Sequence, residues 1–151
     1  MSNYTYMTIS SKSPIFNKIC DYCDREIVQE NLTINGGTLN YSGIIYDSDI
    51  LIICFDKTLP VAFNSIVELD TCIYIYQIAV KNNYKRQGIG TELMQRAISI
   101  AKTKKKAITA HVRDYNEASN HLFQKLAFNA VEPGSNTLYV LETKKYKPGK
   151  K

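Results

Sequence analysis

The stretch from Tyr74 to Leu93, YIYQIAVKNNYKRQGIGTEL, constrains this chain most, because an apolar segment runs through a basic, glycine-containing turn straight into an amphipathic segment. Val, Ile and Tyr at strand spacing predict a strand that ends at Val80. Gly88 and Gly90 lack a Cβ, so the backbone can curl and aim several N–H groups at one point where a helix begins. Such a helix N-terminus favours an anion, because its N–H groups are unpaired and its dipole end is positive. The turn therefore predicts a phosphate-binding site.

Two other phosphate-binding motifs use glycines in this way, and their spacing excludes them here. A dinucleotide-binding turn needs a third glycine at position 93, which is Leu93, and it normally follows the first strand of its domain. A Walker A loop needs Gly-Lys-Ser or Gly-Lys-Thr, and neither occurs in the chain. Taken alone, a G-x-G turn also fits a simpler interpretation, in which the glycines only permit tight packing between strand and helix.

Length and composition indicate one globular domain. A chain of 151 residues with 44% hydrophobic and 22% charged residues can bury one sizeable core. Its longest apolar run, residues 50–55, is far shorter than a membrane span, and its first residues lack the pattern of a signal peptide. We therefore expect a cytoplasmic protein that has no membrane partner.

The net charge of +5 is concentrated at the C-terminus. Residues 144–151, KKYKPGKK, hold five of the 19 basic residues and no acidic one, which leaves 14 basic and 14 acidic residues elsewhere. We expect a single domain over residues 1–143 and a disordered basic tail over residues 144–151. Nucleic-acid binding is not expected, because only the tail favours it and the domain carries no excess positive charge.

Four cysteines raise the question of disulfides or a metal site. Cys20 and Cys23 form a C-x-x-C pair, but no second pair and no His-x-x-x-His partner completes a zinc set. Both also lie on the apolar face of a predicted helix, where this spacing is about one turn. We expect reduced, mostly buried thiols and no metal.

Hydrophobic periodicity predicts alternating strands and helices. Ser13 and Pro14 are typical of an N-cap and of the first helical position. Residues 31–48 have few periodic apolar residues, so we interpret them as a long loop with at most a short helix or strand. The strand after the glycine turn and its helix should run parallel to the strand before them, as in a strand-helix-strand unit. The expected order is a strand at 3–10, a helix to about residue 30, the loop, antiparallel strands at 49–56, 61–70 and 72–80, a helix at 88–104, a strand at 107–113, a helix at 117–126 and a strand at 137–142.

Two motifs at these positions resemble those of the GNAT acetyltransferase superfamily. The family's acyl-CoA loop reads Gln/Arg-x-x-Gly-x-Gly/Ala after an apolar-x-Val strand end; here Ile78-Ala79-Val80 leads into Lys85-Arg86-Gln87-Gly88-Ile89-Gly90. Its second motif is an Asn that starts the short helix, then a Tyr, then Lys-x-Gly-Phe; here it reads Asn116, Phe123 and Lys125-Leu126-Ala127-Phe128. The resemblance implies an α/β (α+β) fold, with a mixed, mostly antiparallel twisted sheet, helices on both faces and a splayed pair of parallel strands.

The resemblance also implies acetyl-CoA as the cofactor. Main-chain groups of Ile78 and Val80 would pair with the pantetheine arm in the gap between the splayed strands, and N–H groups from Arg86 to Thr91 would hold the pyrophosphate. Asn116 would hydrogen-bond the pantetheine, cap the short helix, or do both. The implied cofactor-binding residues are Ile78, Ala79, Val80, Lys85, Arg86, Gln87, Gly88, Ile89, Gly90, Thr91, Asn116 and Phe123.

The sequence departs from the family at the position of the general acid. Phe123 stands where many members place a Tyr that protonates the departing thiolate, and Phe has no proton to give. Tyr115, Tyr139 or water would have to replace it. Ala127 stands in place of a turn glycine, which predicts a slightly different ending of the short helix.

The general base is also open. The strand before the loop carries Tyr74, Tyr76 and Gln77 but no carboxylate. Glu68 and Asp70 on the preceding strand are the nearer candidates, Glu68 first, with a solvated surface acid as the alternative. We interpret His111 and His121 as structural histidines.

The implied function is acetyl-CoA-dependent N-acetyl transfer to a primary amine by direct attack on the thioester. The missing Tyr and carboxylate motivate an alternative, in which the protein binds acyl-CoA as a sensor or interaction module and catalyses poorly. The acceptor would be an amine-bearing small molecule or a peptide; the charge leaves polyamines, antibiotics, small amines, peptide N-termini and lysines open. Many members pair, so a homodimer is one expected state.

Overall fold

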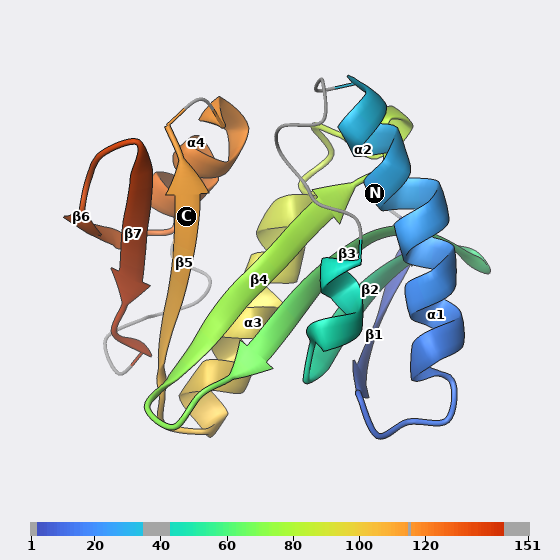
Figure 1. The fold of residues 1–151 in the computed structure, drawn as a ribbon, viewed down its shortest axis with the longest axis horizontal. Coiled ribbons are helices and arrows are strands. Elements are labelled where there is room, and N and C mark those ends of the chain that lie inside the picture. Colours follow the sequence, from blue (N-terminus) through green and yellow to red (C-terminus); the bar gives the residue numbers. More distant parts are fainter. Residues whose placement is uncertain (1–2, 35–42, 115, 144–151) are drawn as a thin grey trace.

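A single twisted sheet with helices on both faces forms the protein in the computed structural model, which describes residues 3–34, 43–114 and 116–143 (Figure 1). The strand order is β1-β2-β3-β4-β5-β7-β6, and among the described strands only β4 and β5 pair in parallel. This confirms the expected mixed, mostly antiparallel fold. The strands are β1 (Tyr4–Ser10), β2 (Ile50–Asp56), β3 (Leu59–Glu68), β4 (Cys72–Val80), β5 (Ala107–Arg113), β6 (Asn129–Glu132) and β7 (Asn136–Leu141). The helices are α1 (Phe16–Cys23), a π-helix (Asp24–Val28), α2 (Gln29–Ile34), 3-10 helices at Ile44–Asp47 and Asn82–Tyr84, α3 (Ile89–Thr103) and α4 (Glu117–Lys125).

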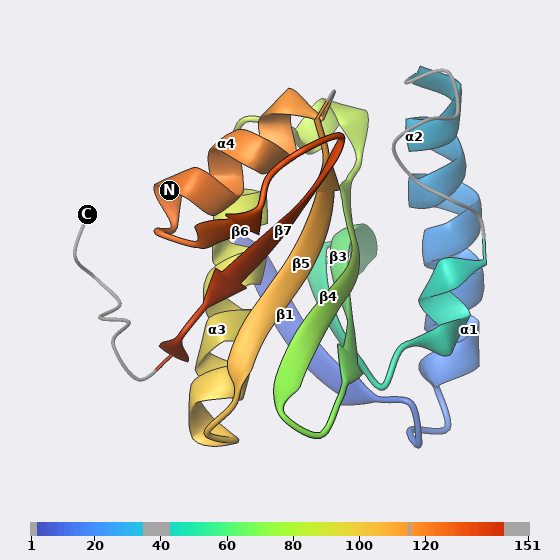
Figure 2. The ribbon, with the colours of Figure 1, turned by 60° about the vertical axis from the view of Figure 1, so that its left-hand side comes forward.

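Two apolar layers hold the helices against the sheet, which Figure 2 shows between α1 with α2 on one side and α3 with α4 on the other. The face of α3 that the periodicity predicted, from Ile89 to Ala101, is buried against residues of β2 to β5 such as Ile52 and Ile73. On the opposite face, Phe16 and other residues of α1 pack on β2 and β3. Full burial of a side chain of this size stabilises the fold by roughly 1.5–3 kcal/mol.

The parallel pair is short, and this opens the sheet. β4 and β5 are in register only from Cys72 to Ile75 of β4, and Figure 1 shows the two strands diverging beyond that point. The register with β3 shifts between Ser65 and Ile66, so that Tyr76 is the extra residue of a β-bulge in β4. The expected splayed pair is therefore confirmed, and below we call the point where it opens the fork.

The first helix differs from its prediction in two ways. It begins at Phe16 and not at Pro14, although Ser13 does act near its start, where its Oγ accepts a hydrogen bond from the Ile15 N–H at 3.4 Å. It also does not stay α-helical to residue 30, because one wider turn, the π-helix Asp24–Val28, separates α1 from α2. The insertion shifts the helical register, and π-turns of this kind are frequent at functional sites.

The C-terminal half has one strand more than expected. All four residues of β6 are exposed, so the segment lacks the alternation that predicts a strand.

In the predicted loop at residues 31–48, α2 continues to Ile34 and a 3-10 helix occupies Ile44–Asp47, while residues 35–42 lie outside the described part. The basic tail at 144–151 also lies outside it.

The cysteines of the C-x-x-C pair are fully buried and free. Burial raises the pKa of the Cys20 and Cys23 thiols to about 12, so both stay protonated and are poor metal ligands. Within the described residues, no group of three or more His, Cys, Asp or Glu side chains is arranged to hold a metal ion. No described helix is both long enough and apolar enough to cross a bilayer.

The expected change at the end of the short helix is not found, because Ala127 adopts the left-handed conformation of a glycine, with φ 68°. Its N–H donates to Gln124 O at 3.0 Å, and the Phe128 N–H donates to Phe123 O at 3.0 Å, which together satisfy the last carbonyls of α4. The helix thus ends as it would with glycine, and the alanine Cβ makes that ending strained.

We predict that Ala127→Gly raises the free energy of unfolding by about 1 kcal/mol, because it relieves this strain. Ala118→Gly, inside α4, should instead lower it by about 1 kcal/mol. Urea denaturation of both variants checks the prediction, and a destabilised Ala127→Gly would contradict it.

Candidate functional site

A cavity of about 820 Å³ lies in the fork between β4 and β5, bounded by the start of α3 and by α4. Every cofactor-binding residue that the sequence predicted lines this cavity except Gln87. The Gln87 side chain is instead held by the Tyr4 hydroxyl of β1, which donates a hydrogen bond to Oε1. The fold thus gathers the predicted residues from β4, the glycine turn, α3 and α4 at one place.

Beyond Ile75, the main chain of β4 presents to this cavity groups that no strand pairs with. Lys81 donates its N–H to Val61 O on β3 at 2.8 Å, so Lys81 faces β3. Main-chain groups of successive strand residues point to opposite edges, and those of Val80 and Ile78 therefore point toward β5. Because β5 has already diverged, it offers them no partner. An extended amide-containing chain could pair here as an added strand would.

The glycine turn is shaped to bind an anion. Arg86 and Gly88 both have positive φ, 65° and 82°, which turns successive N–H groups inward. Gly88 is also the N-cap of α3 and has no side chain to cap the first turn. A Cβ at Gly88 would meet nothing within 4 Å, whereas one at Gly90 would make an ordinary contact of 3.7 Å with Leu122. Gly88 is thus needed for its conformation, and the space beside it is open to a ligand.

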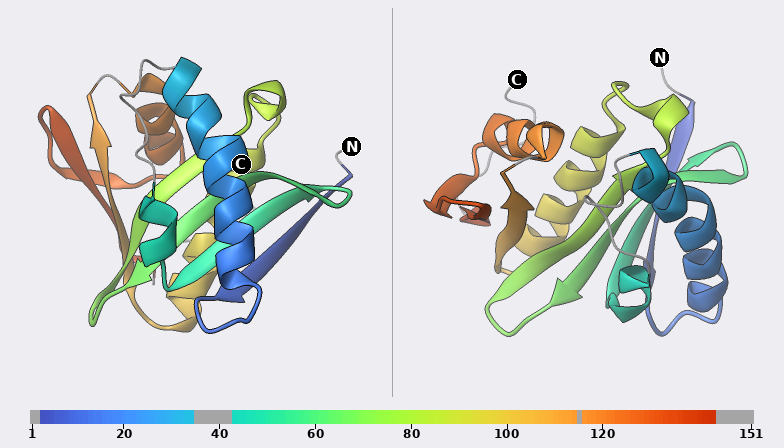
Figure 3. Two further views of the ribbon diagram at one scale, coloured as in Figure 1. Left: turned by 45° about the vertical axis from the view of Figure 1, so that its right-hand side comes forward. Right: turned by 45° about the horizontal axis from the view of Figure 1, so that its top comes forward.

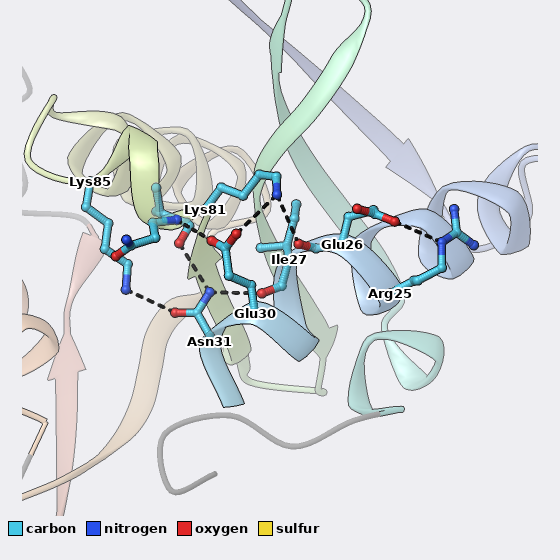
Figure 4. A network of polar contacts seen from close by, with 9 residues as sticks. Arg25, Glu26, Ile27, Glu30, Asn31, Lys81 and Lys85 are labelled. Atoms are coloured by element: carbon cyan, nitrogen blue, oxygen red, sulfur yellow. Dashed lines mark hydrogen bonds and ion pairs between the residues drawn. The ribbon is translucent and has the colours of Figure 1, made fainter. Parts of the chain in front are cut away.

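Asn31 of α2 connects that helix to the far end of β4 (Figure 4). Its Nδ2 donates to Val80 O at 3.2 Å and to Ile27 O at 2.9 Å, and its Oδ1 accepts from Lys85 Nζ at 3.2 Å. Asn31 is 4% exposed and lines the cavity. One buried amide therefore fixes the end of β4 and holds the first lysine of the glycine turn.

Glu30 makes a second connection beside it, and Figure 3 shows α2 next to the β4–α3 connection in both views. Its carboxylate binds Lys81 Nζ at 3.2 Å and accepts the Asn82 N–H. Burial would raise the pKa of Glu30, but the Asn82 N–H and the Lys81 ammonium stabilise the charged form and hold this pKa below its usual value. No pattern in the sequence marks Glu30 or Asn31, because their contacts depend on the helical register after the π-turn.

Tyr74 and His111 meet at the base of the fork. The Tyr74 hydroxyl lies 2.9 Å from His111 Nδ1, the ring centroids are 5.8 Å apart, and both side chains line the cavity. Burial, followed by the neighbouring Tyr76, raises the pKa of Tyr74, so its hydroxyl keeps its proton. Sequence reasoning missed this pair as a candidate for proton transfer, since β4 and β5 come together only in the fold. His121, in contrast, borders a second, separate cavity.

The structure does not bring Glu68 or Tyr139 to the cavity. Glu68 lies opposite Ile73 below the fork and is held by Lys104 and Lys106 at 3.2 and 3.0 Å, which lower its pKa. Tyr139 is buried and donates its hydroxyl proton to Asn120 Oδ1 at 2.7 Å, at the border of the second cavity. The third candidate, Tyr115, lies outside the described residues.

Three residues of the second motif reach the cavity, namely Asn116, Phe123 and Lys125. Asn116 caps α4, where its Oδ1 accepts the Ser119 N–H at 3.2 Å, and it lines the cavity as well. Phe123 is 1% exposed and forms part of the cavity wall, with its ring stacked on Tyr139 at 5.4 Å and edge-on to Phe128 at 4.9 Å. Phe123 is thus an apolar packing residue at this position.

The lowered pKa of Glu30 gives a testable pH dependence. A carboxyl whose folded-state pKa is depressed stabilises the protein above its unfolded pKa, and this contribution is lost as the pH falls. We expect Glu30→Gln to lower the free energy of unfolding by roughly 1 kcal/mol at pH 7, and this difference from wild type should disappear between about pH 5 and pH 3. Glu132→Gln, on exposed β6, is the control and should have no such effect. Urea titrations across this range measure it; a pH-independent difference would contradict the ion pair.

Comparisons with known proteins agree with this geometry. The sequence matches the model of the acetyltransferase (GNAT) family over residues 22–128. No curated protein matches it significantly. The structure is similar to that of PaiA N-acetyltransferase from Thermoplasma acidophilum in complex with coenzyme A, with a TM-score of 0.71 and 14% identity, over 94% of this chain and 99% of that one.

Two further solved structures are similar. A GNAT family acetyltransferase from Elizabethkingia anophelis with acetyl-CoA bound has a TM-score of 0.66 and 16% identity, over 94% of this chain and 99% of that one. Arabidopsis thaliana NAA60 in complex with acetyl-CoA has a TM-score of 0.65 and 12% identity, over 91% of this chain and 99% of that one. With the family model matched across the fork, the glycine turn and α4, the chain belongs to the GNAT acetyltransferase family.

Proposed function

We propose that this protein is an acetyl-CoA-dependent N-acetyltransferase that moves an acetyl group to a primary amine. The observation that carries the proposal is the fork cavity, which joins an anion-binding turn at one end to the Tyr74–His111 pair at the other. Support also comes from the family and from the solved relatives that contain coenzyme A or acetyl-CoA.

The residues present fit acetyl-CoA. The N–H groups from Arg86 to Thr91 would hold the pyrophosphate, because this turn is open and begins a helix. The β5-facing N–H and C=O of Ile78 and the N–H of Val80 would pair with the amides of the pantetheine arm, since no strand pairs with them. The Val80 carbonyl already accepts a hydrogen bond from Asn31 Nδ2. Bound there, acetyl-CoA supplies an acetyl thioester that an amine can attack.

Tyr74 and His111 would take the proton that the amine loses as it attacks. The Tyr74 hydroxyl keeps its own proton and can donate it toward His111 Nδ1 while its oxygen accepts another from the amine. An imidazole suits this task because it can accept a proton on one ring nitrogen and release one from the other. A β5-facing N–H of β4 would stabilise the oxyanion. Phe123 donates no proton, so the sulfur would leave as a thiolate, which an ordinary thiol pKa of about 8.5 permits.

The second candidate function is acyl-CoA binding with poor catalysis, and Phe123 in the cavity wall favours it. Measurement of acetyl-CoA binding, followed by a thiol-release assay with an amine, separates the two functions.

We place the protein in the cytoplasm with either function, because the four free cysteines suit a reducing compartment.

We expect Gly88→Glu to weaken coenzyme A binding by about tenfold relative to Gly88→Gln, because both carry the same backbone strain and only the first repels the pyrophosphate. Isothermal calorimetry on both folded variants measures this difference. Equal affinities would mean that the turn does not contact the phosphates.

We expect His111→Ala to lower kcat by about a hundredfold and Tyr74→Phe by about tenfold, with little change in coenzyme A affinity, because general base catalysis contributes on this scale. Thiol release with the best acceptor from an amine and peptide panel measures kcat. Unchanged turnover in His111→Ala would remove this pair from the mechanism and leave the proton to solvent.

A further inference from the structure

Aromatic side chains form the part of the fork cavity that faces away from α3. Ile73 and Ile75 of β4 pack toward α3, as do the apolar residues of β5. Tyr74 and His111 alternate with these residues along their strands and therefore lie on the opposite face of the sheet. Tyr76 lies beside them, because its ring centroid is 6.1 Å from that of Tyr74. These three side chains all line the cavity, and we call them the aromatic wall.

The aromatic wall lies on the side from which an acceptor would approach. The glycine turn leads into α3, so acetyl-CoA would enter the fork from the side of α3 and α4. An amine must then reach the thioester from the opposite face. Ile44 also lines the cavity, and Figure 2 shows its 3-10 helix, Ile44–Asp47, on the side of α1. The acceptor would therefore lie among aromatic and apolar side chains.

Tyr76 presents a ring that a ligand can cover. Its side chain is 39% exposed, although it is a large aromatic residue that lines a cavity. It is the extra residue of the β-bulge, because its neighbours Ile75 and Gln77 take consecutive partners on β3. Bulges are frequent next to active sites, where they re-aim a side chain. A ligand that buries this ring gains from the apolar area and, if it is itself aromatic, from contact between the two rings.

The cavity has no described acidic side chain that could hold a second ammonium group. The 14 acidic residues of the chain all lie in its described part, because residues 1–2, 35–42, 115 and 144–151 include no Asp or Glu. None of these acidic residues lines the cavity. A polyamine or a basic peptide would leave its additional positive charges there without a carboxylate, which is unfavourable in a partly enclosed site. The lining therefore favours an acceptor whose only charge is that of the reacting amine.

We propose, on the basis of the function proposed above, that the acceptor is a monoamine with an aromatic ring on a short aliphatic linker, and that Tyr76 selects it. The amine lies at the Tyr74–His111 pair, and its ring packs against the ring of Tyr76. The nitrogen bonds to the acetyl carbon, the C–S bond breaks, and the sulfur leaves as a thiolate. The proton that the nitrogen loses passes through the Tyr74 hydroxyl to His111. Tyr76 is then a specificity-determining residue and takes no part in the transfer.

The test uses three amines as acceptors. Phenethylamine has an aromatic ring, cyclohexylethylamine has the same linker with a saturated ring, and diaminobutane has a second ammonium group in place of a ring. Thiol release from acetyl-CoA, with mass spectrometry of the product, gives kcat and KM for each amine. Because the amines differ in their own pKa, the effect of a variant is measured as its ratio to wild type for one amine at one pH.

Replacement of the Tyr76 ring should affect the aromatic amine most. We expect Tyr76→Leu to lower kcat/KM about tenfold for phenethylamine and about twofold for cyclohexylethylamine, because leucine keeps an apolar contact but offers no ring. The loss should appear in KM with kcat unchanged, since the ring contact is the same before and during transfer. Tyr76→Phe keeps the ring and should behave as wild type. Tyr22→Leu, on α1 and outside the cavity, is the matched control and should also behave as wild type.

Wild-type protein should use diaminobutane at least about tenfold less efficiently than phenethylamine, because the second ammonium finds no carboxylate. The opposite order would overturn the inference, since it would mean that the aromatic wall attracts a cation. Equal losses for phenethylamine and cyclohexylethylamine in Tyr76→Leu would overturn it as well. Calorimetry with acetyl-CoA shows whether each variant is folded, and the wild-type comparison stands even if Tyr76→Leu is not.

The failure of this inference is distinguishable from failure of the proposed function. If acetyl-CoA raises the melting temperature but none of the three amines releases thiol, the aromatic monoamine is wrong and transfer to another amine is still open. If acetyl-CoA does not bind, both proposals are wrong.

Discussion

The four-residue parallel pairing between β4 and β5 is the constraint on which the site depends. A longer pairing would close the sheet and give the main chain of Ile78 and Val80 hydrogen-bond partners on β5. If the two strands did not pair at all, nothing would hold β5 and α4 in place relative to α3. The short pairing joins the two halves of the sheet, and beyond the fork it leaves backbone that no strand pairs with. The β-bulge at Tyr76 adds to the divergence by bending β4.

The helices keep this opening in a defined shape. On one face, α3 and α4 pack under β4 and β5 and place the glycine turn and Asn116 at the mouth of the cavity. On the other face, the π-turn sets the register that brings Glu30 and Asn31 to the end of β4. These polar contacts suit the end of β4, because the hydrogen bonds of Glu30 and Asn31 are directional and therefore fix a loop better than apolar contacts would.

The cavity also differs in chemistry between its two ends. Anion-binding groups gather at the glycine turn, where N–H groups and nearby cations act together. The Tyr74–His111 pair lies at the opposite end, where burial raises the pKa of Tyr74 and keeps its hydroxyl protonated. The carboxylate of Glu30 on α2 binds Lys81, and Glu117 of α4 lines the second cavity, so the lysines and arginines of the described lining face no carboxylate there.

Local patterns in the sequence were sufficient for most of the fold and for the cofactor end of the site. Strand alternation, helical periodicity and the glycine turn are properties of contiguous residues, and all the predicted loop residues but Gln87 line the cavity. The prediction failed where the sequence carries no local pattern. It missed β6, whose residues are all exposed, and it missed the π-turn, which only shifts the helical register. Glu68 and Tyr139 were chosen by residue type and strand position, and the fold gave both of them other partners. What the sequence by itself determined is therefore the order of elements and the anion-binding turn, because these depend on neighbours along the chain. Only the tertiary structure decided that Tyr74 meets His111, that Asn31 holds Lys85, and that no carboxylate lines the cavity, because each depends on how separate strands and helices are packed together.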